Sequence, residues 1–156
     1  MKIQIARILC PVDFSESSEH ALHYAFAFAE TYQAELILMH VMDYAALDVP
    51  DFPSAVEFSA DTIQQIREVC EKRLQEVVAR EQAKSIRVSS RLVSGTPAYE
   101  IVQAARDETA DLIIIGTHGR TGLSRVLMGS VTEKVIRKAP CPVLTVKVPQ
   151  HEFVKP

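Results

Sequence analysis

The chain has 156 residues and a formal net charge of −3, and 47% of its residues are hydrophobic. A domain of this length can bury about 70% of its unfolded surface without staples, and the 3 cysteines include no CxxC pair that would indicate a disulfide framework or a zinc site. The negative charge and the lack of basic blocks disfavour nucleic-acid binding, and no apolar run reaches the roughly 18 residues of a membrane span, so we expect a cytoplasmic protein without membrane insertion.

The start of the chain predicts two strands that flank a helix. Residues 3–9 are rich in isoleucine and leucine and end at Cys10-Pro11, which predicts a strand followed by a break. Ser15 can cap a helix whose apolar residues recur at the i, i+3, i+4, i+7 spacing. The near-continuous apolar run 34–42 is typical of a strand that is covered on both faces.

The middle of the chain predicts an irregular segment, a long helix and a third strand. Residues 43–58 contain two prolines and show no clear period, so we expect an irregular connection there. An apolar stripe predicts a helix that begins near Ser59 and ends at about residue 84. Residues 86–93 predict a more polar strand, which suits a position near an edge of the sheet.

A helix and a buried strand follow. Thr96-Pro97 has the form of an N-cap and a first-turn proline, which predicts a helix to about Arg106. The apolar run 111–116 then predicts the most deeply buried strand of the chain.

The end of the chain predicts one more helix and strand. Ser130 and Glu133 have the spacing of a capping box, which predicts a helix start. Residues 142–148 alternate in a way that indicates an edge strand. We therefore assign residues 1–149 to one domain and residues 150–156 to a loose tail.

Strands and helices alternate throughout, which predicts a single three-layer α/β/α domain with a five-stranded, mainly parallel sheet. If the strand order is 3-2-1-4-5, the first and fourth strands are neighbours and the winding direction reverses between them. Ligands of such sheets bind at the carboxyl ends of the strands beside this reversal. Residues 10–15 and 116–131, which follow these two strands, then face one crevice, and this predicts a ligand site.

Four of the 5 glycines lie in the stretch GTHGRTGLSRVLMGSV. Gly116 and Gly119 can let main-chain N–H groups approach phosphate oxygens, and Gly129-Ser130 leads into a helix start whose dipole favours an anion. A long surface loop with tight turns is the alternative explanation of these glycines. The chain has no GxxxxGK[ST], no GxGxxG after the first strand and no GxSxG, which argues against P-loop, dinucleotide and common hydrolase sites.

With these motifs the sequence resembles the universal stress protein family, in its nucleotide-binding branch. The family signature of Gly-x-x-Gly, nine residues and Gly-Ser/Thr is met from Gly116 to Ser130, and the resemblance extends from ILCPVDFS at 8–15 to PCPVLTV at 140–146. It implies a fold of the adenine-nucleotide alpha-hydrolase type. It also implies an ATP-binding regulator that forms a homodimer through the strand Val143 to Val146.

The resemblance also implies a role for each site residue. Asp13 would bind the ribose or an associated Mg²⁺, and Val41 would hold the adenine through its main chain. Pro11, Val12 and Ile115 would line the base and sugar side. The residues implied to hold the phosphates are Gly116, Gly119, Arg120, Gly129, Ser130 and Val131. The implied cofactors are therefore ATP, or ADP or AMP, with Mg²⁺, and the sequence does not identify a regulatory protein partner.

Several of these residues have a simpler alternative role. Asp13 can form local hydrogen bonds at the first helix or turn, and Ser130 can cap the last helix as well as bind phosphate. Arg120 and Arg125 can be solvated loop charges. His118 has no predicted nucleophile or carboxylate partner, so we do not expect it to be catalytic.

We therefore predict a binding protein that changes loop or partner contacts with the state of its nucleotide. Any hydrolysis is expected to be slow, because no base or water-positioning residue is evident. The alternative from another class is an enzyme, either a nucleotide hydrolase or an AMP-forming ATP user with a related α/β fold. A flavodoxin-like carrier of FMN is a weaker alternative, since Phe14 is the one aromatic residue in the two site loops.

Overall fold

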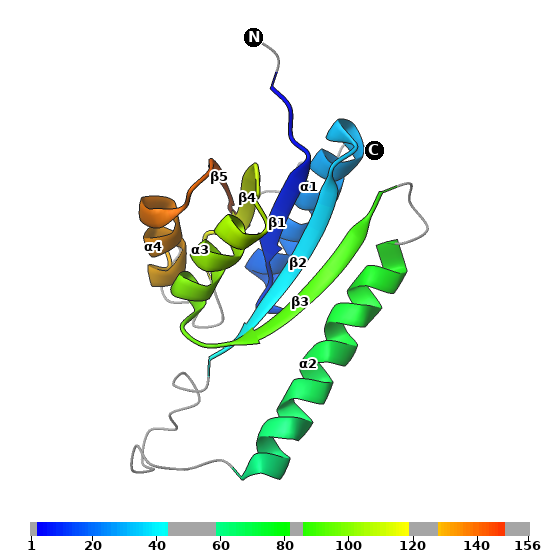
Figure 1. Ribbon diagram of the computed structural model, residues 1–156, viewed down its shortest axis with the longest axis vertical. Helices are drawn as coiled ribbons and strands as arrows, with labels where there is room; N and C mark the ends of the chain where they lie inside the picture. Colours follow the sequence, from blue (N-terminus) through cyan, green and yellow to red (C-terminus); the bar gives the residue numbers. More distant parts are fainter. Residues whose placement is uncertain (1–2, 44–58, 82–85, 119–127, 149–156) are drawn as a thin grey trace.

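Strands and helices alternate along the chain in the computed structural model, which describes residues 3–43, 59–81, 86–118 and 128–148 (Figure 1). The strands are β1 (Arg7–Pro11), β2 (Glu35–Met42), β3 (Val88–Ser94), β4 (Leu112–Gly116) and β5 (Val143–Val146). The helices are α1 (Glu16–Tyr32), α2 (Ala60–Glu81), α3 (Pro97–Asp107) and α4 (Ser130–Lys138). Beyond Asp43, the predicted irregular connection lies outside the described residues, as does the tail. No helix in the described ranges is long and apolar enough to cross a membrane.

The sheet has the strand order β3-β2-β1-β4-β5, and its strand pairs are parallel, which confirms the prediction. β1 lies at the centre, with β2 on one side and β4 on the other (Figure 1). Among the described strands β3 and β5 form the edges, as predicted for residues 86–93 and 142–148. The winding direction reverses between β1 and β4, which is where open sheets of this kind bind ligands.

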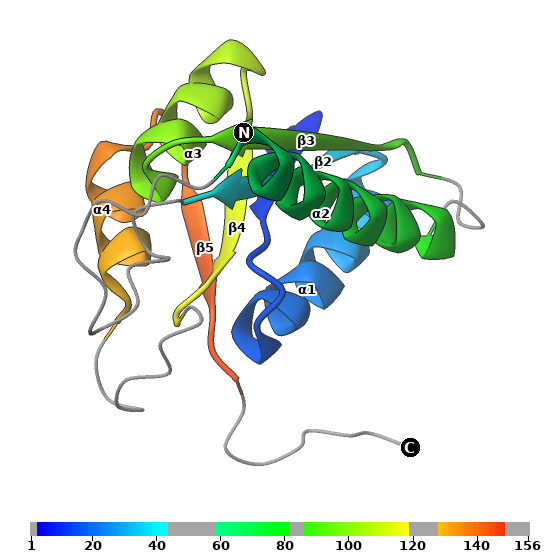
Figure 2. The ribbon, with the colours of Figure 1, turned by 90° about the horizontal axis from the view of Figure 1, so that it is seen from below.

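Two helices cover each face of the sheet (Figure 2). Successive residues of β1 point to opposite faces: Ile8 packs in a cluster with Leu22 of α1 and Leu74 of α2. Leu9 packs instead in a second cluster with Ile101 of α3 and with side chains of α4. Each large side chain buried in this way stabilises the fold by about 1.5–3 kcal/mol. The predicted three-layer architecture is therefore confirmed.

β1 begins and ends later than the predicted strand 3–9. It runs over Arg7–Pro11, so the proline belongs to the strand rather than to a break after it. The next residue, Val12, donates its N–H to the Met39 carbonyl of β2 at 2.8 Å, so the nitrogen of the proline faces β4. Described pairing with β4 ends at Leu9. The missing N–H of the proline therefore costs no hydrogen bond in the described sheet.

α1 and α3 begin where predicted, but only one of the two N-cap residues uses its hydroxyl group to cap the helix. Ser15 caps α1 as predicted and accepts a hydrogen bond from the Ser18 N–H at 3.3 Å. Thr96 occupies the N-cap of α3, and Pro97 follows in the first turn, yet the Thr96 side chain makes no capping hydrogen bond. The fixed φ of proline already favours the helical turn, so the hydroxyl is not needed to begin the helix.

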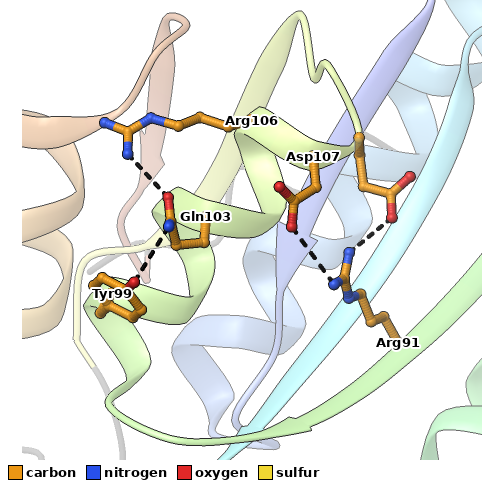
Figure 3. Close-up of polar contacts among 6 residues, drawn as sticks. Arg91, Tyr99, Gln103, Arg106 and Asp107 are labelled. Carbon is orange, nitrogen blue, oxygen red and sulfur yellow. Dashed lines mark hydrogen bonds and ion pairs between the residues drawn. The ribbon is translucent and has the colours of Figure 1, made fainter.

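Arg91 of the edge strand β3 is tied to the C-terminal end of α3 (Figure 3). Its guanidinium donates to the Glu108 carboxylate at 2.8 Å and lies 3.8 Å from the Asp107 carboxylate. Because these side chains are partly exposed, each ion pair stabilises the fold by about 0–1 kcal/mol, and together they fix the far end of α3. Figure 3 also shows the hydrogen bonds along α3 that join Tyr99, Gln103 and Arg106.

The thiol of Cys10 is fully buried in the cluster beneath α1. This burial, together with the negative charge of Glu19, raises the pKa of the Cys10 thiol from 9.0 to about 12. In the unfolded chain the thiol loses its proton near pH 9, whereas the folded state keeps it. The free energy of unfolding therefore falls as the pH rises from about 9 to about 12.

We expect Cys10→Ala to remove this part of the pH dependence. Above pH 9 the stability of the unsubstituted protein relative to the variant should fall by about 1.4 kcal/mol per pH unit, because one unit of pKa corresponds to that free energy. Urea unfolding of both proteins at pH values from about 7.5 to 10.5 measures the effect, and the value at the lowest pH corrects for the change in packing. A stability difference that stays constant across this range would contradict the raised pKa.

Candidate functional site

A cavity of about 330 Å³ lies at the carboxyl ends of β1, β2 and β4 and reaches the first turns of α3 and α4. Every predicted ligand residue that the structure describes lines it: Pro11, Val12, Asp13, Val41, Ile115, Gly116, Gly129, Ser130 and Val131. The other two predicted residues, Gly119 and Arg120, lie outside the described residues. The reversal between β1 and β4 thus brings the two predicted loops to one cavity.

Sequence reasoning did not select several residues that also line the cavity: Ser18, Met39, His40, Asp43, Pro97, Ile101, His118 and Thr132. Met39 and Ile101 follow the strand and helix periods that also predict core positions, so no signal in the sequence separates them from the core. His40 differs, because it is a polar residue within an otherwise apolar strand. That contrast is a signal that could have drawn attention to His40, but it was not used in the prediction.

The two ends of the glycine-rich loop are hydrogen-bonded to each other. The Gly129 N–H donates to the Thr117 carbonyl at 2.8 Å, and the buried Thr132 hydroxyl donates to the Gly116 carbonyl at 2.8 Å. The Thr117 N–H in turn donates to the Val146 carbonyl of β5 at 3.0 Å. These bonds hold the start of α4 beside the ends of β4 and β5.

The first turn of α4 brings main-chain N–H groups to the cavity wall. Its N-cap is Gly129, and the first intrahelical bond runs from the Glu133 N–H to the Gly129 carbonyl at 3.0 Å. The N–H groups of Ser130, Val131 and Thr132 therefore have no acceptor within the helix. All three residues line the cavity, and the helix dipole adds partial positive charge at the same place. This arrangement suits a phosphate or another anion.

The predicted capping box of Ser130 and Glu133 is wrong. Ser130 is the first residue of the helix rather than its cap, because Gly129 already has the extended cap conformation, with φ −61° and ψ 144°. The Glu133 carboxylate does not reach back to the cap and instead accepts a hydrogen bond from Arg137 at 2.9 Å. Ser130 is exposed and lines the cavity, and its hydroxyl does not cap the helix.

Gly116 is required by the packing of α1 against the end of β4. A Cβ atom at this position would lie 2.5 Å from the Ser17 hydroxyl oxygen and 2.7 Å from the Ser17 carbonyl oxygen. A main-chain atom cannot move aside as the end of a flexible side chain can, so a larger residue would displace α1 from the sheet. This packing requirement is independent of the ligand role predicted for Gly116.

Asp13 is held by local hydrogen bonds at the entry to α1. Its carboxylate accepts hydrogen bonds from the Ser15 N–H at 3.1 Å and from the Ser15 hydroxyl. Its own N–H donates to the Ser18 hydroxyl at 3.3 Å. The local role considered from the sequence is therefore present. The same bonds place Asp13 on the cavity wall, where it can also meet a ligand.

His118 contacts Thr117 and Ser17 among the residues that the structure describes. Its ring Nδ1 lies 2.9 Å from the Thr117 hydroxyl, and its main-chain N–H donates to the Ser17 hydroxyl at 3.2 Å. Its ring Nε2 is buried and has no hydrogen-bond partner in the described part of the chain. Within the same residues, no group of three or more His, Cys, Asp or Glu side chains could hold a metal ion. The described contacts thus give His118 no carboxylate partner of the kind that activates a general base.

Comparison with known proteins gives consistent matches along the whole fold. The model of the Universal stress protein family matches residues 4–147. Universal stress protein MJ0577 of Methanocaldococcus jannaschii is 35% identical over 158 residues, which cover 94% of this chain and 98% of that protein. The solved structure of MJ0577 matches with a TM-score of 0.83 at 36% identity and covers 96% of this chain and 100% of that chain.

Two further solved structures with the same fold contain nucleotides. A universal stress protein in complex with cAMP matches with a TM-score of 0.65 at 26% identity and covers 93% of this chain and 98% of that chain. A protein of the family from Arabidopsis thaliana, with AMP bound, matches with a TM-score of 0.63 and covers 93% of each chain. At 18% identity this last likeness speaks for the fold alone.

We expect Gly116→Ala to lower the free energy of unfolding by about 1–3 kcal/mol, because the added methyl group overlaps with Ser17. Ser130→Ala is the matched control and should change stability by less than about 0.5 kcal/mol, because its hydroxyl is exposed and is not a cap. Urea unfolding of the three proteins measures both effects. Unchanged stability of Gly116→Ala would contradict the close approach of α1. A clear loss of stability in Ser130→Ala would show that the Ser130 hydroxyl caps the helix after all.

Proposed function

Because the chain belongs to the universal stress protein family, we propose that it is an ATP-binding regulator that holds ATP with Mg²⁺ between the loop after β1 and the start of α4. The observation that carries this proposal is the first turn of α4, where the N–H groups without intrahelical acceptors belong to residues that line the cavity. Each hydrogen bond from such a group to a phosphate oxygen contributes about 1.5–3 kcal/mol. The relative in complex with cAMP supports an adenine nucleotide as the class of ligand.

The remaining lining residues suit the other parts of the nucleotide. Pro11, Val12 and Ile115 pack against the base and sugar, and the main chain of Val41 holds the adenine. Asp13 contacts the ribose or the Mg²⁺. The residues that bind the phosphates are Gly116, Gly119, Arg120, Gly129, Ser130 and Val131. Since Gly119 and Arg120 lie outside the described residues, their part rests on the family signature alone.

Two carboxylates line the cavity, Asp13 and Asp43, and we assign Asp13 to a magnesium ion carried by the nucleotide. Mg²⁺ commonly takes one or two carboxylates together with phosphate oxygens and water molecules, so it does not need a cluster of protein ligands. The carboxylate of Asp13 lines the cavity and is oriented by its bonds to Ser15. When bound, the ion neutralises charge on the phosphates, and the chain itself contributes the orientation of this carboxylate.

We further propose a homodimer in which β5 (Val143–Val146) pairs with its copy in a second subunit. β5 pairs with β4 on one side, and no other described strand lies on its outer side. Most of its side chains are only partly buried, as expected for an edge that a second copy covers.

Sedimentation at tens of micromolar is expected to give about twice the chain mass of 17.4 kDa. The expected cause is the pairing of the two outer edges, which satisfies main-chain groups that are unpaired in one copy. A monomer under these conditions would count against the dimer and would leave the ATP proposal unaffected.

Ser130→Asp is expected to weaken ATP binding at least tenfold while the fold stays intact. An aspartate in the first turn suits the helix dipole, but its charge repels a phosphate at the same place. Calorimetric titration with ATP measures the change in Kd, for which tenfold corresponds to about 1.4 kcal/mol. Gln75→Glu, on the exposed side of α2, adds the same charge away from the cavity and should bind ATP like the unsubstituted protein.

Denaturing the purified protein and identifying what it releases separates the alternatives. ATP or ADP that is released by the unsubstituted protein and not by Ser130→Asp supports the proposal. A yellow FMN chromophore, or no nucleotide together with no measurable affinity for ATP, contradicts it. Steady-state phosphate release far faster than about one turnover per minute, lost on Asp13→Asn while ATP still binds, would instead identify a hydrolase.

A further inference from the structure

β2 holds Val12, the residue that directly precedes Asp13, at both of its main-chain groups. The Val12 N–H donates to the Met39 carbonyl at 2.8 Å, which continues the ladder of the sheet. The Val12 carbonyl accepts a second hydrogen bond from the ring Nδ1 of His40 at 2.7 Å. This second bond comes from a side chain, so regular strand pairing alone would not supply it.

The position of the His40 ring and the nitrogen that carries its proton both follow from its contacts. Because a carbonyl oxygen only accepts, Nδ1 must carry the proton in its bond to Val12. His40 is 3% exposed, so the bond is shielded from competing water. The same ring packs against Phe14, with the ring centroids 4.7 Å apart. His40 therefore contacts the residues on both sides of Asp13.

Phe14 needs such support, because its φ of +62° is unfavourable for a bulky residue. The guanidinium carbon of Arg73 in α2 lies 5.3 Å from the centroid of the Phe14 ring, which is a cation–π contact. The ring is thus held from β2 by His40 and from α2 by Arg73. These contacts hold the side chain of the residue that directly follows Asp13.

We propose that His40 is the positioning residue for Asp13: by holding the residues on both sides, it fixes the carboxylate where the Mg²⁺ of bound ATP is coordinated. This inference rests on the proposed function. The bonds of Asp13 to Ser15 and Ser18 attach it to the start of α1. His40 adds a side-chain link to β2 beside the main-chain bond from Val12 to Met39.

Hydrogen exchange in the ligand-free protein, followed residue by residue by NMR, tests the link directly. His40→Leu removes the donor and keeps an apolar side chain, whereas His40→Asn keeps an amide N–H donor near the position of Nδ1. We expect the amides of Asp13 and Ser15 to exchange about tenfold faster in His40→Leu and within about threefold of the unsubstituted rate in His40→Asn. His23→Leu, on the exposed side of α1, is the control and should leave both rates unchanged.

Titration with ATP in Mg²⁺ and in EDTA provides the second readout. In His40→Leu we expect the affinity in Mg²⁺ to fall about tenfold and the affinity in EDTA to change less than about threefold, because the carboxylate acts through the ion. His40→Asn should retain both affinities. A general loss of stability would instead lower the two affinities together.

Unchanged exchange rates in His40→Leu would overturn the link between His40 and the Asp13 loop, whatever the ligand. Equal losses of affinity in Mg²⁺ and in EDTA would overturn the role in placing the carboxylate for the ion. If the unsubstituted protein binds no ATP, the proposed function fails, and the exchange rates still decide whether His40 fixes the loop. If His40→Leu does not fold, His40→Phe removes the donor to the Val12 carbonyl, keeps a ring against Phe14 and should give the same pattern of faster exchange.

Discussion

Main-chain pairing of β1 with both β2 and β4 is the constraint on which the rest of the structure depends. Because these pairs are parallel, each connection must return from the carboxyl end of one strand to the amino end of the next, and the helices carry it there. The helices after β1 and β2 cover one face, and those after β3 and β4 cover the other. After β1 the chain therefore continues toward β2, whereas after β4 it continues toward β5 on the other side of the sheet. The cavity lies between the ends of β1 and β4, where these two connections diverge.

Much of the fold could be predicted because the patterns involved have direct physical causes. The apolar runs 34–42 and 111–116 indicated buried strands, since a strand covered on both faces has little room for polar side chains. The start of β1 was wrong because apolar composition does not reveal where pairing begins, and Ile3 is in fact 69% exposed. The predicted cap at Ser130 was wrong because the spacing of Ser and Glu does not show which residue has the extended backbone of an N-cap. In the structure that residue is Gly129.

The position of the candidate site could be predicted from two unusual loops and the rule for open parallel sheets. The contacts among the residues that form the site could not be predicted. The sequence predicted that a ligand approaches Gly116, and it did not show that Ser17, which is far away in the sequence, also comes close to this glycine. The contact of His40 with the Val12 carbonyl was likewise hidden, because a histidine in an apolar strand indicates burial without naming its acceptor. Both contacts join segments that only the folded chain brings together.

The hydrogen bonds that join Thr117 to Gly129 and Gly116 to Thr132 have a consequence for the kinetics of binding. They hold the start of α4 through groups of the protein itself, so an anion does not have to bring its donors together and loses less entropy on binding. With this end of the cavity organised in advance, related ligands are expected to associate at similar rates and to differ in how long they stay. If the proposed function holds, residence time, rather than the rate of capture, is the quantity through which the cavity would distinguish one nucleotide from another.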